Sequence, residues 1–195
     1  LLRRELPAFT AGHRPAAGRF SDDLDEMLAW APHLDSSYVA IQGPPGTGKT
    51  YRGARLVRAM LLAGKRVGIT AMSHAAVENL LEAVVAAFDE AGDSHLLRAV
   101  KRGDEPTAGG TFGVDYAATN PPAARGDYNL VAGTTWLFAG GDMQQHPVDV
   151  LIIDEAGQLA LADALAATRS AHNLVLLGDP LQLPQVAQAS HPGGG

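Results

Sequence analysis

Short, nearly continuous apolar segments alternate along the chain with longer segments in which apolar residues recur every three or four positions. The continuous segments predict buried strands over residues 38–42, 66–71, 95–100, 128–133, 148–154 and 173–179. The helical spacing predicts helices over residues 49–62, 73–92 and 159–169. Strands that alternate with helices in this way predict an α/β fold, in which helices cover both faces of a mostly parallel sheet. Ligands then gather at the carboxyl ends of the strands.

The pattern also divides the chain into unequal parts. Residues 1–37 are expected to form a lead-in arm followed by a helix that Ser21 caps, and residues 38–195 are expected to form one ATPase domain. Residues 101–127 lose periodicity and are rich in Gly, Pro, Asp and Asn, which predicts an irregular excursion from the domain.

Composition limits the class of protein. With 195 residues, of which 46% are hydrophobic, the chain can build one real core. The absence of cysteine excludes disulfides and thiolate metal sites, and makes the cytoplasm the default location. No apolar run reaches the roughly 18 residues of a membrane helix, so no membrane partner is expected. A net charge of −6 argues against tight, salt-driven binding of nucleic acid by this domain alone, although weak or shared binding is compatible with it.

A phosphate-binding loop follows the first predicted strand. The segment GPPGTGKT satisfies GxxxxGK[ST] between a strand and a helix, which is the context that the motif requires. Its glycines allow backbone N–H groups to wrap around phosphate, its lysine carries a charge for the outer phosphates, and its last hydroxyl suits Mg²⁺. The predicted nucleotide-binding residues are Gly43, Pro44, Pro45, Gly46, Thr47, Gly48, Lys49 and Thr50.

A pair of acidic residues follows the strand over residues 148–154. Asp154, at the strand end, is the candidate to hold Mg²⁺ together with Thr50, and Glu155 is placed to orient or deprotonate the attacking water. Two solvated acids that cap a helix would be an equally ordinary reading of this pair alone. Beside the phosphate loop, the pair indicates a nucleoside triphosphatase that uses ATP and Mg²⁺.

Five segments in the same order resemble superfamily 1 helicases, most closely the Upf-like branch that translocates 5′ to 3′. They are QGPPGTGKT, ITAMSHAAVENLL, VAGTTWLFA, DEAGQ and GDPLQLPQV, and they span about three quarters of the chain. A narrower likeness, carried by GTGKTY, SHAAVENLL and ASHP, is to bacterial helicases joined to a RecB-type nuclease.

The resemblance implies a RecA-like P-loop core in which the strand over 173–179 lies between the phosphate-loop strand and the Asp154 strand. Asp179 and Gln182 would then reach the γ-phosphate, Asp179 as a binding residue and Gln182 as a catalytic sensor beside Lys49 and the acidic pair. Residues that match the family's nucleic-acid contacts are Thr70, Ser73, His74, Asn79, Gly133, Thr134 and Thr135. Each also has an ordinary structural reading, such as Ser73 as a helix cap. Trp136 and Phe138 could stack on bases, but core packing is the more frequent role of such residues.

The resemblance also implies partners: single-stranded nucleic acid, with DNA favoured over RNA, a second RecA-like domain that this chain lacks, and a fused nuclease. The chain departs from the family because no glutamine stands before Gln42 to recognise adenine. We therefore expect the motor half of an ATP-dependent helicase or translocase that binds nucleotide but hydrolyses it weakly by itself. A protein-remodelling ATPase or a nucleotide-dependent regulatory module are the alternatives.

Overall fold

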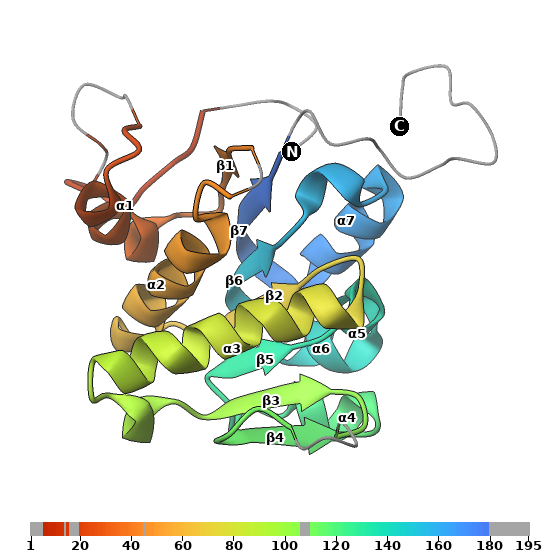
Figure 1. Cartoon of the computed structure of the whole chain (residues 1–195). Coiled ribbons are helices and arrows are strands. Elements are labelled where there is room, and N and C mark those ends of the chain that lie inside the picture. The colour runs from red at the N-terminus through yellow and green to blue at the C-terminus, as the bar shows by residue number, and fades with distance from the viewer. Residues whose placement is uncertain (1–5, 14, 16–19, 45, 106–109, 180–195) are drawn as a thin grey trace.

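The computed structural model describes residues 6–13, 15, 20–44, 46–105 and 110–179, and within them a single parallel sheet organises the chain (Figure 1). Its seven strands lie in the order β1-β7-β6-β2-β5-β3-β4, and every neighbouring pair is parallel. This arrangement confirms the predicted α/β class. The strands are β1 Tyr38–Gln42, β2 Val67–Thr70, β3 Ala99–Arg102, β4 Val114–Ala117, β5 Leu130–Ala132, β6 Val148–Ile153 and β7 Ala171–Gly178.

Helices cover both faces of the sheet, as predicted. One buried cluster joins α1, α2 and α3 to one face, and a second joins α4, α5, α6 and α7 to the other face (Figure 1). The helices are α1 Leu24–Trp30, α2 Lys49–Leu62, α3 His74–Glu90, α4 Asn120–Ala124, α5 Thr135–Ala139, α6 Gly141–Gln145 and α7 Leu161–Ala167, with 3-10 turns η2 Ala31–His33, η3 Ser94–Leu96, η4 Ala156–Gln158 and η5 Thr168–Ser170.

Strand order brings the predicted motifs together. β7 pairs with β1 on one side and with β6 on the other, so the strand that ends at Gly178 lies between the phosphate-loop strand and the Asp154 strand. The order that the helicase resemblance implies is therefore present. Because the strands are parallel, the ends of β1, β7, β6 and β2 all lie at one edge of the sheet.

Local signals explain the two long helices. α2 occupies the predicted residues 49–62 and begins after Gly48, whose left-handed backbone (φ +75°) only glycine adopts readily. α3 begins after Ser73, whose side chain accepts a hydrogen bond from the Ala76 N–H at 3.1 Å. Gly92, at φ +74°, follows the end of α3 as predicted.

Four sequence predictions need correction. The cap of α1 is Asp23, whose side chain accepts a hydrogen bond from the Glu26 N–H at 3.0 Å, and not Ser21. Residues 101–127 are not wholly irregular, because they contain β4 and α4. β4 is a half-exposed strand at the edge of the sheet, so it has no apolar run to reveal it, and the prolines of α4 stand in its first turn, where a missing N–H costs nothing. The strand expected over 95–100 lies at Ala99–Arg102, after the turn η3, and the helix expected over 159–169 is shortened to α7.

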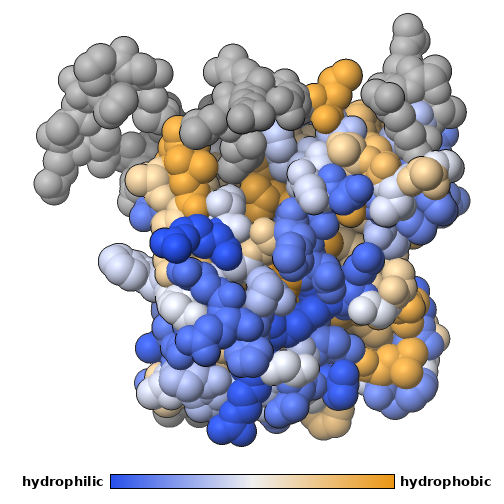
Figure 2. Space-filling model, turned by 180° about the vertical axis from the view of Figure 1, so that it is seen from behind, coloured by the Kyte–Doolittle hydropathy of each residue, from blue (hydrophilic) through white to orange (hydrophobic). Residues whose placement is uncertain are grey.

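The amino-terminal segment packs beside β1. Phe9 forms an antiparallel bridge with Leu34, and the rings of Phe9 and Phe20 both contact Trp30, with centroids 5.8 and 5.4 Å away. On the face seen from behind relative to Figure 1, apolar surface is divided into separate patches by hydrophilic areas (Figure 2). None of the helices in the described ranges has the length and apolar character needed to cross a membrane.

Candidate nucleotide site

The phosphate loop continues directly from β1 and is held against β7. The Gly43 N–H donates to the Gly178 carbonyl at 3.1 Å, and the Thr47 hydroxyl donates to the Pro44 carbonyl at 2.8 Å. A Cβ atom at Gly43 would lie 2.6 Å from that hydroxyl oxygen, and Gly46 has φ +80°. The loop therefore needs glycine at both positions, which is the physical reason for the motif.

Lys49, the first residue of α2, has its ammonium group inside the loop. Its Nζ donates to the carbonyl oxygens of Gly43 and Pro44, at 2.5 and 2.8 Å. These are main-chain acceptors, so the positive charge has no paired carboxylate in this contact. An outer phosphate could replace the two carbonyls as the partner of the ammonium group.

Asp154 is a buried carboxylate at the end of β6, with only 8% of the residue exposed. Its N–H donates to the Thr70 carbonyl at 2.8 Å, which fixes the strand end against β2. Burial raises the pKa of the Asp154 carboxyl above its usual value, against the opposing effects of a hydrogen bond from the Glu155 N–H and the charge of Lys49. A cation in this place would favour the ionised form of Asp154.

Glu155 has a left-handed backbone, at φ +52°, and precedes the turn η4. This conformation is uncommon for a residue with a side chain, and such residues concentrate at functional sites. The turn allows Gly157 to approach β7, since a Cβ atom there would lie 2.9 Å from the Asp179 carbonyl oxygen. Glycine is thus required where η4 crosses the end of β7.

One cavity of about 410 Å³ collects these groups at the carboxyl edge of the sheet. It is lined by Gly46, Gly48, Lys49, Thr50, Ala76, Asn79, Asp154, Glu155, Gly178 and Asp179. The sheet order thus brings together residues that are separated by up to 133 positions (179 − 46) in the sequence. Pro45 and Gln182, which were also predicted for this site, lie outside the described residues.

The structure moves one predicted residue to a different site. Asn79 was grouped with the nucleic-acid contacts, but it lines the nucleotide cavity beside Ala76. Both residues stand in the first turns of α3, which starts where β2 ends. Sequence reasoning missed this placement because α3 reaches the cavity only through the pairing of β2 with β6.

The other nucleic-acid candidates lie at the ends of β2 and β5, which are neighbours in the sheet. His74 is exposed at the start of α3, and Thr134 and Thr135 begin α5. Ser73 is exposed and also caps α3, so its ordinary structural reading holds. Thr70 and Gly133 are buried, and the Thr70 hydroxyl has no hydrogen-bond partner among the described residues.

Trp136 and Phe138 have opposite environments. Phe138 is buried in the core, as expected from the usual role of such residues, whereas 81% of Trp136 is exposed on α5.

Arg102, which sequence reasoning did not select, lies close to Gly133: its Cβ atom is 3.3 Å from the position that a Cβ atom at Gly133 would have. The Arg102 Nε donates to Asn120 Oδ1 at 3.2 Å, which orients the guanidinium group.

A buried charge network supports this part of the sheet from α3. The Lys101 ammonium lies 2.9 Å from Glu78 Oε2, and the hydroxyls of Tyr116 and Thr111 donate to Glu78 Oε1 at 2.6 and 2.9 Å. Burial alone would raise the pKa of Glu78, but the hydrogen bonds from Tyr116, Lys101 and Thr111 outweigh it and lower the pKa. The network fixes α3 to β3 and β4.

The fold and the cavity define a P-loop nucleotide-binding domain of the α/β class. The chain belongs to the AAA domain family, whose model matches residues 29–192. Its relatives include the DNA replication ATP-dependent helicase/nuclease dna2 of Schizosaccharomyces pombe, 30% identical over 161 residues, and DNA2 of Saccharomyces cerevisiae, 28% identical over 165 residues. These matches cover 81% and 80% of this chain, but only 11% and 10% of the relatives.

The relatives confirm the resemblance to superfamily 1 helicases that the five ordered segments predicted. The names of both relatives combine helicase with nuclease, which agrees with the predicted likeness to helicases joined to a nuclease. That this chain is of the bacterial type stays a prediction. Among solved structures, the arterivirus nonstructural protein 10 helicase in complex with DNA aligns over 87% of this chain and 33% of that chain, with 20% sequence identity and a TM-score of 0.49.

Proposed function

We propose that this chain is the first RecA-like half of an ATP-dependent helicase or translocase that acts on single-stranded nucleic acid. The observation that carries the proposal is the single cavity that contains the phosphate loop, Asp154, Glu155 and Asp179. A glycine loop alone would bind phosphate. The same loop facing two acidic residues at a strand end has the groups needed to cleave a phosphoanhydride bond.

Thr50 and Asp154 fit the ligands of Mg²⁺. The ion prefers oxygen atoms and usually binds proteins through one or two carboxylates, with water and phosphate as its other ligands. Both side chains line the cavity, and because burial raises the pKa of Asp154, a cation bound there would favour its ionised form. The bound ion would neutralise negative charge on the phosphates of ATP.

Protein groups supply the remaining chemistry in this proposal. Lys49 holds the outer phosphates after leaving the carbonyls of Gly43 and Pro44. Glu155 orients the attacking water or accepts its proton, because its turn places it on the same cavity. Asp179, together with Gln182, distinguishes ATP from ADP through the γ-phosphate and passes the change to the segment that follows.

The nucleic acid would run over the ends of β2, β5 and β3. Ser73, His74, Thr134 and Thr135 offer polar groups to phosphate and sugar, which allows a motor to step along any sequence. Thr70 and Gly133 support this surface from below, since both are buried. Arg102 adds a positive charge and Trp136 a face on which a base can stack.

The remaining parts of the motor are proposed from the family. The cavity is built from one α/β domain, and a second RecA-like domain would supply arginine residues, a contribution worth about 10³–10⁵ in rate for arginine fingers. A fused nuclease, DNA rather than RNA as the track, and a cytoplasmic location belong to the same proposal. We therefore expect residues 1–195 to bind ATP with Mg²⁺ but to turn it over slowly.

Steady-state hydrolysis measured with and without a single-stranded oligonucleotide tests the motor. We expect the full-length protein to hydrolyse ATP and the oligonucleotide to stimulate it, whereas residues 1–195 alone give little stimulation. Hydrolysis by the full-length protein that no oligonucleotide changes would contradict a nucleic-acid motor and would favour a protein-remodelling ATPase. Tight binding of ATP without turnover would favour a regulatory module.

A further inference from the structure

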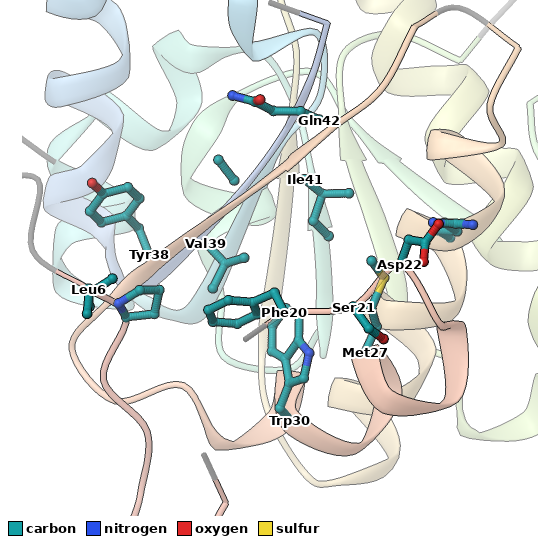
Figure 3. Close-up of a pocket in the computed structure, with 13 residues that line it drawn as sticks. Leu6, Phe20, Ser21, Asp22, Met27, Trp30, Tyr38, Val39, Ile41 and Gln42 are labelled. Atoms are coloured by element: carbon teal, nitrogen blue, oxygen red, sulfur yellow. The ribbon is translucent and has the colours of Figure 1, made fainter. Parts of the chain in front are cut away.

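A cavity of about 510 Å³ lies beside β1, next to the amino-terminal segment (Figure 3). Phe20 and Arg52 are among the residues that line it. Gln42, on its wall, is followed directly by Gly43, the first residue of the phosphate loop. This cavity therefore adjoins the nucleotide site and is not a separate one.

A larger cavity, of about 590 Å³, lies between the outer side of α3, at the front of the molecule in Figure 1, and the turn before β4. None of the described residues that line it also lines the nucleotide cavity. Its residues on α3 recur at helical spacing and so form one straight stripe. The stripe and the facing wall define the α3 groove: Glu82, Val85, Ala86 and Asp89 on α3, and Leu97 and Phe112 opposite them.

Phe112 is an aromatic residue that a fixed turn holds in solvent, with 92% of the residue exposed. The preceding Thr111 donates its hydroxyl to Glu78 Oε1 at 2.9 Å and its N–H to the Tyr116 hydroxyl oxygen at 2.9 Å. The Val114 N–H donates to the Thr111 carbonyl at 3.2 Å and closes the turn. A large apolar side chain on such an anchored backbone is pre-organised for burial by a partner, because little freedom is lost on binding.

Two acidic residues stand at the ends of the stripe on α3. Glu82 and Asp89 are two turns apart, which is about 10.5 Å along the helix axis. Both are exposed, and neither forms an ion pair with another described residue, whereas Glu90 of the same helix is paired with Arg55. The α3 groove therefore combines an apolar centre with negative charge at both ends.

The charge of the groove limits the class of partner. Carboxylates repel the phosphates of nucleic acid and of anionic membranes, so neither of these fits the groove. A second copy of a chain with a net charge of −6 is disfavoured by the same repulsion. An apolar stripe with an acid at each end instead complements an amphipathic helix that has lysine or arginine two turns apart and apolar residues between them.

We infer that the α3 groove docks a basic amphipathic helix of a protein partner, with Phe112 as the apolar anchor and Glu82 and Asp89 as the charge partners. A cation of the helix lies against each carboxylate, while its apolar side chains cover Val85 and Ala86. The inference goes beyond the proposed function, because no described residue proposed to bind nucleotide or nucleic acid lines this groove. Failure of one proposal leaves the other intact.

Two labelled synthetic helical peptides test the inference by fluorescence anisotropy with the full-length protein. Both have the same leucine-rich apolar face, and two lysines placed two turns apart in one peptide are replaced by glutamates in the other. We expect the lysine peptide to bind at least about tenfold more tightly than the glutamate peptide, and Phe112→Ala to weaken the lysine peptide about tenfold. The double variant Glu82→Lys with Asp89→Lys should reverse the preference.

The double variant Asp25→Lys with Glu26→Lys is the matched control, because both acids are exposed on another helix, α1, and the change in net charge is the same. It should leave the preference for the lysine peptide unchanged. Reversal of the preference by this control as well would reduce the effect to overall charge and overturn the inference. Equal unfolding temperatures of the variants and the parent protein guard against loss of fold.

Two further outcomes would assign the groove to a different occupant. If the parent protein binds neither peptide, or binds both with equal affinity, a basic helix is not its ligand and the inference fails. Sedimentation velocity at several protein concentrations detects self-association. A dimer that Phe112→Ala dissociates would show that a second copy covers the groove, and this too would overturn the inference.

Discussion

The N–H of Glu155 donates a hydrogen bond to Asp154 Oδ1 at 2.9 Å, while Glu155 itself has the left-handed backbone angle φ +52°. The two acidic residues are thus neighbours with different environments. Asp154 is buried at the end of a strand, and Glu155 begins a turn that is partly exposed. In the proposed function, this difference in environment suits Asp154 to bind a cation and Glu155 to activate water.

Glu155→Gln should slow ATP hydrolysis by about 10²–10³-fold and leave ATP affinity nearly unchanged. The amide keeps the size of the side chain but cannot accept the proton of the attacking water. Single-turnover kinetics and calorimetry on the full-length protein measure the two effects. Equal hydrolysis rates for the variant and the parent protein would remove Glu155 from the mechanism.

Asp154→Asn should stabilise the nucleotide-free protein at neutral pH and abolish Mg²⁺-dependent binding of ATP. Burial raises the pKa of Asp154, so the ionised carboxylate lowers the stability of the folded state above that pKa. This loss of stability, which is the cost of burying the charge, disappears as the pH falls through the raised pKa. The amide removes the cost at every pH. Thermal unfolding at several pH values, without nucleotide, should show the largest gain at neutral pH. A variant less stable than the parent protein would mean that Asp154 is stabilised by its surroundings.

Lys49→Ala should weaken binding of ATP and of tripolyphosphate by at least about 10²-fold, because charged hydrogen bonds to phosphate contribute about 1.5–3 kcal/mol each. The ammonium group of Lys49 lies 2.8 Å from the Pro44 carbonyl oxygen. Lys49 is the only lysine among the residues that line the nucleotide cavity. Lys65→Ala, just beyond the end of α2, is the matched control. Retained affinity of Lys49→Ala in calorimetry would place the phosphates elsewhere.

Trp136→Ala should lower the affinity for single-stranded DNA about tenfold, since base stacking contributes roughly 1–3 kcal/mol. Removal of a side chain that is 81% exposed should leave the unfolding temperature unchanged. Phe112→Ala removes another aromatic residue, 92% exposed, and serves as the control. Fluorescence anisotropy with a labelled oligonucleotide measures the affinity, and an effect of equal size from both variants would exclude a specific stack at Trp136.

Lys101→Met should destabilise the domain by about 3 kcal/mol, because it leaves the Glu78 carboxylate buried without its cation. The double variant Lys101→Met with Glu78→Leu should recover much of that loss. Denaturant unfolding of the two single variants and the double variant gives the coupling energy. A double variant destabilised by the sum of the two single effects would show that the pair is not coupled.

The same pair predicts a dependence on pH. The folded-state pKa of Glu78 is below its ordinary value of 4.5, so its contribution to stability is present above pH 4.5 and is lost as the pH falls through the lower, folded-state pKa. Glu78→Gln should therefore be less stable at neutral pH and should lose less stability on acidification. Parallel pH profiles for the variant and the parent protein would contradict this assignment.

The class of the fold and the phosphate site could be read from the sequence, because their signals are local. A strand buried on both faces needs a continuous apolar run, and a phosphate loop needs glycine at fixed offsets from lysine. The helix over 49–62 was therefore predicted to the residue, and Lys49, Thr50, Asp154, Glu155 and Asp179 meet in one cavity as expected. β4 and α4 were not predicted, because β4 is stabilised by pairing with β3 and α4 by packing in the core. Such contacts produce no recognisable pattern in a segment of a few residues.

Only the tertiary structure decided which residues face which site. Asn79 lines the nucleotide cavity, Thr70 is buried and Trp136 is exposed, although all three stand in segments assigned to nucleic acid. The cavity beside β1 joins Phe20 and Arg52, which no motif connects. Sequence patterns record the periodicity of a helix or strand, whereas the exposure of one side chain depends on distant segments that pack against it. Those contacts arise when the sheet orders β1, β7, β6 and β2 side by side.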